Sequence, residues 1–115
     1  MRAPGADHLR FGEDGLLVAV AQSVEDRAVL MVAHMDREAY RLTLATGEAH
    51  FWSRSRSRLW RKGESSGNVL HVERIERDCD GDAVLLVVHA DGPACHLGRR
   101  SCFEAEPGMG RTSIG

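Results

Sequence analysis

Metal ligands of two chemical kinds lie close together in the sequence, between residues 78 and 103. This stretch holds three cysteines, Cys79, Cys95 and Cys102, and the first of them is bracketed by the aspartates Asp78, Asp80 and Asp82. Thiolates select zinc or copper(I), whereas carboxylates select magnesium, calcium or manganese. The stretch therefore predicts two different metal ions in one site.

The cysteines suit a zinc ion that is shared between two subunits. Cys79 precedes the apolar run 83–89 and Cys95 follows it. As a strand, that run spans about 23 Å at about 3.3 Å per residue, so a second subunit can bring its Cys79 to Cys95 and Cys102 across a two-fold axis. Three thiolates leave the fourth zinc position open to a water molecule, which the ion acidifies. The alternative is that the three are ordinary buried cysteines.

The aspartates suit a magnesium ion. Asp78, Asp80 and Asp82 alternate along the chain, so in an extended segment they point to one side and Cys79 points to the other. A cation would relieve the repulsion between the three carboxylates. Mg²⁺ is the expected ion, because it combines few carboxylates with water and substrate phosphates. The alternative is an acidic strand end in contact with solvent.

His96 directly follows a candidate zinc ligand. Histidine transfers protons near neutral pH, so His96 is a candidate catalytic base. A fourth zinc ligand and an ordinary loop histidine are the alternatives, and the sequence leaves all three open.

A basic stretch with tryptophans at its edges occupies residues 52–62 and is followed by small polar residues up to Asn68. Guanidinium groups bind phosphates, indole rings stack on bases, and hydroxyl and backbone N–H groups cradle phosphate. The expected ligand is therefore anionic and nucleotide-like. The alternatives are a solvated charged face or a disordered Ser-Arg repeat, although Trp52 and Trp60 argue against disorder. The candidate substrate-binding residues are Trp52, Arg54, Arg56, Lys62, Ser65, Ser66, Gly67, Asn68, Arg99 and Arg100.

The length of the chain predicts one small domain, and its net charge is too close to neutral to favour binding of nucleic acid or membranes by overall charge. The chain has 115 residues, three cysteines and a formal net charge of −2. It suits a single domain over residues 1–115, with 1–15 as an arm that a partner chain orders in part and 104–115 as a flexible tail. No run approaches the about 20 apolar residues of a membrane span, and no signal peptide is recognised, so a cytoplasmic location is expected. An odd number of cysteines favours free thiols or metal ligands over disulfides.

The hydrophobic pattern predicts a β-rich α+β domain. A helix is expected over residues 37–46, between Asp36 as N-cap and Gly47 as C-cap, with Tyr40 and Leu44 on one face. Strands are expected over residues 16–21, 28–33, 48–54, 69–77 and 83–89.

Two rival functions share the zinc chemistry. His71 and Glu73 match the H-x-E motif of nucleobase deaminases, but the P-C-x-x-C partner motif is missing, because six residues separate Cys95 from Cys102. A zinc-stabilised nucleic-acid-binding module would need four zinc ligands and has no use for three aspartates. Chelation would unfold such a module, whereas an open catalytic site could lose turnover and keep its fold.

Four stretches in combination resemble one enzyme family. They are G-E-A-H-F-W-S-R-S-R (47–56), L-W-R-K-G-E-S-S-G-N (59–68), D-C-D-G-D (78–82) and A-C-H-L-G-R-R-S-C-F (94–103). They are similar to single-domain phosphoribosyl-AMP cyclohydrolase of histidine biosynthesis, over residues 29–103. The resemblance implies a hydrolase that acts on a cyclic amidine C–N bond. It would open the adenine ring of phosphoribosyl-AMP between N1 and C6 to give the formimino-imidazolecarboxamide ribonucleotide ProFAR, the third step of L-histidine biosynthesis.

The resemblance also implies roles for individual residues. Zinc, one ion per subunit, would be bound by Cys95, Cys102 and the partner subunit's Cys79. Magnesium would be bound by the three aspartates, and His96 would act as a base. The implied fold is a small folded mixed β-sheet, pseudo-barrel-like, with one main helix in an intertwined homodimer. Four positions depart from the commonest family residues, and one of them, Leu97, removes a hydroxyl near the metal loop without changing the ligand set. These positions are His34, Asp36, Ser65 and Leu97.

Overall fold

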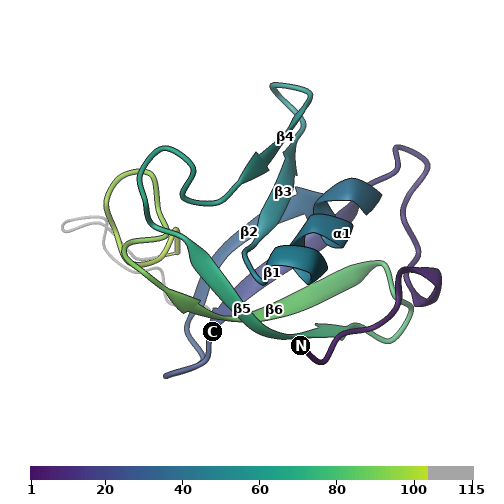
Figure 1. The fold of residues 1–115 in the computed structure, drawn as a ribbon, viewed down its shortest axis with the longest axis horizontal. Helices are drawn as coiled ribbons and strands as arrows, with labels where there is room; N and C mark the ends of the chain where they lie inside the picture. Colours follow the sequence, from purple (N-terminus) through teal and green to yellow (C-terminus); the bar gives the residue numbers. More distant parts are fainter. Residues whose placement is uncertain (104–115) are drawn as a thin grey trace, which may run out of the picture.

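A six-stranded mixed sheet forms the body of the domain (Figure 1). The computed structural model describes residues 1–103. The strand order is β4-β3-β2-β1-β6-β5, and β1 and β6 are parallel whereas the other neighbours are antiparallel. The elements are η1 (Ala6–His8), β1 (Leu17–Ser23), β2 (Val29–Met35), α1 (Arg37–Thr46), β3 (His50–Ser53), β4 (Arg58–Arg61), β5 (Leu70–Arg77) and β6 (Ala83–Ala90).

The sheet curls until its two halves meet. The backbone N–H of Ala49, just before β3, donates to the carbonyl of Leu70 at 3.0 Å, and Val72 N–H donates to the carbonyl of Gly47 at 2.7 Å. These bonds join the start of β5 to the residues before β3, which lie on the opposite side of the strand order. The result is a half-barrel, and the predicted β-rich fold with a mixed pseudo-barrel sheet and one main helix is confirmed for the described residues.

The core lies inside the curl, because each strand alternates its side chains between the two faces. β1 buries Leu17, Ala19 and Ala21, and β6 buries Val84 and Leu86 on the same side. Phe51, Leu70 and Tyr40 of α1 are also fully buried. Burial of each large apolar side chain contributes about 1.5–3 kcal/mol, so the core stabilises the curl.

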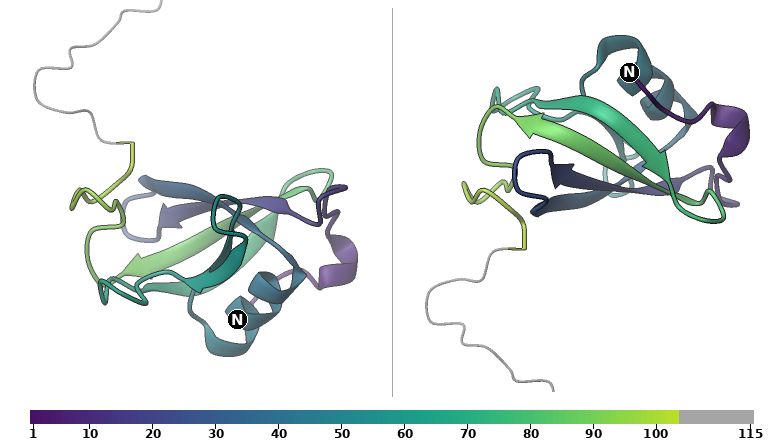
Figure 2. Two further views of the ribbon diagram at one scale, coloured as in Figure 1. Left: turned by 90° about the horizontal axis from the view of Figure 1, so that it is seen from above. Right: turned by 90° about the horizontal axis from the view of Figure 1, so that it is seen from below.

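Helix α1 packs against one side of the curled sheet, as both views of Figure 2 show. Its predicted bounds and caps are confirmed: Asp36 Oδ1 accepts from Ala39 N–H at 2.8 Å, and Gly47 has a φ of 75°. Tyr40 and Leu44 stand four apart on α1 as predicted, but only Tyr40 is buried, whereas Leu44 is 38% exposed. Ala39, Tyr40 and Thr43 form the buried face instead.

Strand β4 and the course of the N-terminal arm were not predicted. The arginines of 54–62 obscure β4, which pairs with β3 and places Trp60 5.2 Å from Phe51 between ring centroids. The arm packs on its own chain: Tyr40 donates to the carbonyl of Pro4, and Ile75 N–H donates to the carbonyl of Arg2 at 2.9 Å. The predicted flexible tail, 104–115, lies outside the described residues. Within 1–103, no helix has the length and apolar character needed to span a membrane.

Candidate active site

A cavity of about 590 Å³ lies between the β3–β4 hairpin, the loop 63–68 and the loop after β6. It gathers eight of the residues that the sequence analysis selected. They are Trp52, Arg56, Lys62, Ser65, Ser66, Asn68, Cys95 and His96. Candidate phosphate and base contacts therefore meet two of the candidate metal-site residues in one place.

The hairpin supplies the aromatic part of this cavity. Trp52 of β3 pairs with His34 of β2 and with Leu59 of β4, and both Trp52 and His34 line the cavity. Trp60 of β4 lines it as well. Burial, and then the charge of Arg54, lower the pKa of His34 below its ordinary value. The cavity thus offers two indole rings and a histidine whose neutral form is favoured.

The basic side chains of the cavity have different partners. Arg58 pairs with Glu64, and Arg61 lies 3.5 Å from a carboxylate oxygen of Glu48. Lys62 Nζ donates to the carbonyl of Ala94 at 2.5 Å. Arg56 has no acidic partner within the part of the chain that the structure describes. Arg56 and Lys62 therefore have no carboxylate partner among the described residues, and of these two only Lys62 already donates to a backbone carbonyl.

Gly63 lets the loop 63–68 turn back tightly on itself. Its φ is 88°, and a Cβ there would lie 2.6 Å from the backbone of Asn68 and Val69. Gly67 N–H donates to the Gly63 carbonyl at 2.8 Å. The loop can therefore direct Ser65, Ser66 and Asn68 to the cavity only because position 63 lacks a side chain.

The loop 94–102 brings two thiols close together. Cys95 N–H donates to the Arg99 carbonyl at 3.1 Å, and Cys102 N–H donates to the carbonyl of Leu30 in β2 at 2.8 Å. Cys95 is buried, and Leu97 N–H approaches its Sγ at 3.5 Å. Burial and the neighbouring Cys95 thiol raise the pKa of Cys102. A soft cation would compensate two such thiolates, so this loop fits a zinc ion.

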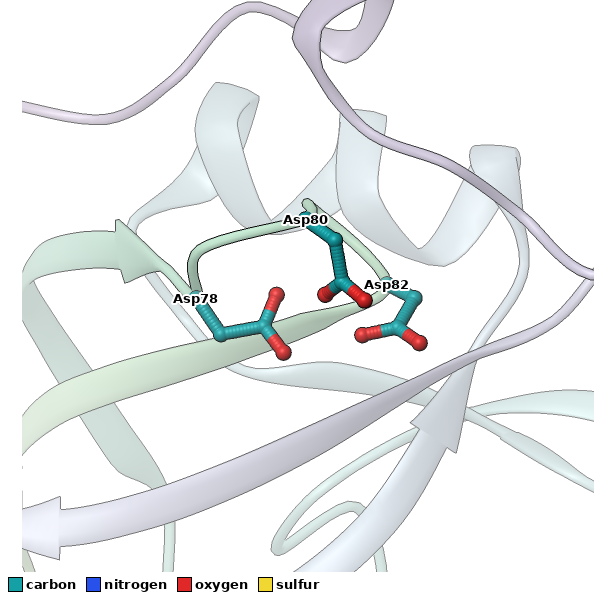
Figure 3. A group of neighbouring side chains, drawn as sticks. All are labelled: Asp78, Asp80 and Asp82. Atoms are coloured by element: carbon teal, nitrogen blue, oxygen red, sulfur yellow. The ribbon is translucent and has the colours of Figure 1, made fainter.

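A turn, and not the predicted extended segment, brings the aspartates together (Figure 3). Gly81 has a φ of 77°, and its N–H donates to the Asp78 carbonyl at 3.2 Å. One oxygen from each of Asp78, Asp80 and Asp82 lies within 4.8 Å of the others, and all three residues are exposed. The predicted extended conformation of residues 78–82 was therefore wrong. The turn nevertheless brings the three carboxylates closer together than a strand would.

Within the cluster of three carboxylates, the pKa values of Asp78 and Asp82 are shifted in opposite directions. Hydrogen bonds with Asp80 and then Asp78 raise the pKa of Asp82 to about 6. Desolvation raises the pKa of Asp78, but hydrogen bonds with Asp82 and Ala83 outweigh it, so the net shift is downward. Without a cation the cluster therefore retains a proton near pH 6. Three oxygen donors that compete for one proton fit a hard divalent ion such as Mg²⁺.

Strand β6 separates the two candidate metal sites within one chain. The 78–82 turn, which includes Cys79, precedes β6, and the loop 94–102 follows it. Figure 1 shows this turn beside η1 and the loop at the opposite end of the strand. Eight strand residues span about 26 Å at about 3.3 Å each. Among residues 1–103, the only group of three or more clustered metal ligands is the aspartate set, so one chain brings two of its three thiols together.

Comparison with known proteins identifies the family. The family model described as phosphoribosyl-AMP cyclohydrolase matches residues 31–104. This chain belongs to that family. Two curated phosphoribosyl-AMP cyclohydrolases show the same relationship. The protein from Brucella abortus (strain 2308) is 57% identical over 96 residues, covering 82% of this chain and 81% of its own length. The protein from Sphingopyxis alaskensis is 56% identical over 104 residues, covering 87% and 82%.

As a phosphoribosyl-AMP cyclohydrolase family member, the chain is a hydrolase, and the family match spans the cavity and the thiol loop. The structure does not bring every candidate substrate-binding residue to the cavity. Arg54, Gly67, Arg99 and Arg100 do not line it. Arg58, Trp60 and Arg61 of the predicted basic stretch line the cavity although they were not selected individually, and His34 and Glu64 line it without having been predicted to bind substrate. Strand β4 reads R-L-W-R, without alternation of polar and apolar residues, so the sequence carries no clear signal for this strand.

The deaminase-like motif of the cyclohydrolase chain has other contacts. His71 Nε2 lies 2.8 Å from Asp91, and Glu73 lies 3.5 Å from His89. These four side chains are exposed on β5, β6 and the turn after β6, and none of them lines the cavity. The H-x-E match therefore has no support from the geometry.

Proposed function

We propose that this chain hydrolyses the adenine ring of phosphoribosyl-AMP between N1 and C6, giving ProFAR in the third step of histidine biosynthesis. The observation that carries the proposal is the single cavity that combines Trp52, Trp60 and Arg56 with Cys95 and His96. Indole faces suit a purine, a guanidinium suits a phosphate, and thiolates beside a histidine suit hydrolysis. In the reaction, a water oxygen bonds to C6, the N1–C6 bond breaks, and a proton is transferred to N1.

Cys95, Cys102 and the partner subunit's Cys79 would hold a zinc ion. Bound there with one open position, the ion would supply a water of lowered pKa beside the substrate. His96, which is exposed at the cavity wall, would take the proton of the attacking water and return it to the leaving nitrogen. Asp78, Asp80 and Asp82 would hold Mg²⁺, whose charge would help to orient the phosphorylated substrate.

Arg56 would bind a substrate phosphate. Arg58 and Arg61 already face carboxylates, and Lys62 holds the carbonyl of Ala94. Arg56 would offer a phosphate in the cavity a guanidinium without a carboxylate partner, and Ser65 and Ser66 would offer hydroxyl groups. The neighbouring ion pairs would hold the wall in shape.

The active unit would be a homodimer, because one chain lacks the third thiol at the loop 94–102. An apolar face supports this. Val20 pairs with Val32 of β2 and with Leu85 of β6, and all three lie on the side of the sheet away from the core. Val18 and Val32 are 37% and 47% exposed. A contiguous apolar face of this kind is typical of an interface.

Two-fold symmetry through this face would join the half-sites. An axis perpendicular to β6 and through its middle reverses the strand in the second subunit. The Cys79 end of one β6 would then lie over the Cys95 end of the other. One contact would thus cover the valines and complete two identical zinc sites.

The test is ring opening of phosphoribosyl-AMP followed by absorbance, with zinc and magnesium varied separately after removal of metals. We expect turnover that requires zinc and rises with magnesium. No ring opening at any metal concentration would disprove the proposed reaction. Full turnover by metal-free protein would support the reaction but disprove the role of zinc in it.

A further inference from the structure

Arg100 forms a bidentate salt bridge with Asp26, in the turn between β1 and β2. Its Nη1 donates to Asp26 Oδ2 and its Nη2 donates to Asp26 Oδ1, each at 2.9 Å. The same carboxylate accepts from Ala28 N–H at 3.1 Å. Asp26 is therefore held by its own turn and presents both oxygens to one guanidinium, which is the geometry in which an exposed ion pair is strongest.

Arg100 also closes the loop that carries the two thiols. Its carbonyl accepts from Ala94 N–H at 3.2 Å, next to Cys95. The following residue, Ser101, donates from its hydroxyl to the carbonyl of Val29 at 2.6 Å. The backbone of Arg100 thus belongs to the thiol loop, while its side chain is fixed 74 positions away in the sequence.

We propose that Asp26 is a positioning residue, which holds Cys95 and Cys102 in the geometry for zinc by fixing Arg100. The proposal rests on the zinc role given above. Asp26 lies outside residues 31–104, the segment that the family model matches. It touches neither the cavity nor the thiols, so its effect passes through Arg100 and the loop backbone.

The contact acts on the loop more than on the whole fold. Both side chains are about half exposed, at 49% and 54%, and exposed ion pairs change global stability little. The loop 94–102 has no strand pairing, and Lys62 anchors its start through Ala94. The Cys102 side keeps the bonds of Ser101 and Cys102 to the carbonyls of Val29 and Leu30. Loss of the Asp26 contact would therefore loosen this side of the loop without detaching it, while the sheet stays folded.

The test compares Asp26→Asn with Glu25→Gln in the full chain. Glu25 is the adjacent exposed acid, and the bond it makes to Ser23 uses its backbone N–H. Zinc affinity is measured by competition with a chromogenic chelator. Iodoacetamide labelling of Cys95, followed by peptide mass in the metal-free protein, reports loop opening without any activity. We expect Asp26→Asn to bind zinc about tenfold or more weakly, as changes to residues that support metal ligands do, and to label Cys95 several-fold faster.

The double variant Asp26→Arg with Arg100→Asp restores the pair in reverse. Recovery of zinc affinity relative to either single variant supports the proposal, and additive loss overturns it. Equal zinc affinity and equal labelling in Asp26→Asn and Glu25→Gln also overturn it. If the unaltered protein binds no zinc, the proposed zinc role fails, and the labelling rates of the same variants still decide whether Asp26 holds the loop. Circular dichroism verifies folding, and the double variant carries the comparison if Asp26→Asn does not fold.

Discussion

Residues of one chemical type have different tasks in this protein, and their neighbours decide which. Arg58, Arg61 and Arg100 each face a carboxylate, whereas Arg56 lines the cavity without one among the described residues. A guanidinium whose charge is already compensated by a carboxylate gains less from a phosphate than one without an acidic partner. The arginines therefore divide into one candidate ligand-binding residue and several that hold loops in place.

At this scale, Cys102→Ala tests the thiol site. The substitution should lower zinc affinity and turnover by more than about 100-fold, beyond the range found for residues that only support metal ligands. Zinc content by atomic absorption and the ring-opening rate measure the two effects. Leu97→Ala, an exposed change in the same loop, is the control and should keep both. A zinc-depleted Cys102→Ala protein with near-normal turnover would contradict the zinc assignment.

The Asp26 carboxylate should make stability depend on pH. The hydrogen bonds from Arg100 lower the pKa of Asp26 from 3.8 to about 2. An acid whose pKa is depressed in the folded state stabilises the fold above its unfolded pKa, and that stabilisation disappears as the pH falls through the folded pKa. The Tm difference between the unaltered protein and Asp26→Asn should be constant at pH values well above the unfolded pKa of 3.8, and it should shrink as the pH falls towards 2. Low salt is needed, because the pair is exposed. A difference that stays the same down to about pH 2 would rule out this contact as the cause.

The loops do more than the strands to shape the cavity, and their glycines are not equivalent. Gly63 and Gly67 both have positive φ, at 88° and 81°. A Cβ at Gly63 would overlap the backbone of Asn68 and Val69, whereas a Cβ at Gly67 would meet nothing within 4 Å. The first glycine is therefore required by both conformation and space, and the second by conformation alone.

Alanine at these two positions gives a matched pair at the scale of the loop. Gly67→Ala should cost about 1–2 kcal/mol from the left-handed backbone. Gly63→Ala should cost at least about 1 kcal/mol more, because the overlapping backbone has to shift. Urea denaturation measures both, and the substrate KM should rise for Gly63→Ala as Ser65 and Ser66 move. Equal losses in the two variants would show that the close approach at Gly63 is not restrictive.

For the whole molecule, β6 is the dividing element. It holds Cys79 and the aspartates at one end and the loop 94–102 at the other. A rigid strand of about 26 Å cannot bend its ends together. The proposed site therefore depends on a second copy of the chain, and the exposed valines of β1 and β2 are the surface through which the copy would bind.

Subunit mixing tests this arrangement. Cys79→Ala and Cys102→Ala should each be inactive as homodimers. In a mixed dimer, one of the two sites keeps all three thiols. Equal mixing makes half of the dimers mixed, so about a quarter of the unaltered activity should return. Native mass spectrometry measures exchange, and each variant incubated alone is the control. Proven exchange with no recovered activity would rule out the shared site.

The sequence by itself determined the ligand types and the local structure. The caps at Asp36 and Gly47 bound α1 correctly, because capping depends on residues a few positions apart. The short apolar run 16–21 likewise predicted strand β1. The thiols, the aspartates and His96 were recognised from residue type and spacing alone, while their zinc, magnesium and base roles remain proposals.

Only the tertiary structure decided which of these residues meet. Strand β4 forms because β3 pairs with it, which the charges of Arg58 and Arg61 concealed. The aspartates converge through a turn at Gly81, and Arg100 reaches Asp26 rather than the cavity. These outcomes depend on contacts between residues distant in the sequence, and such contacts exist only after the sheet has curled. Spacing along the chain could therefore predict the ligands of the site but not the partners that hold them.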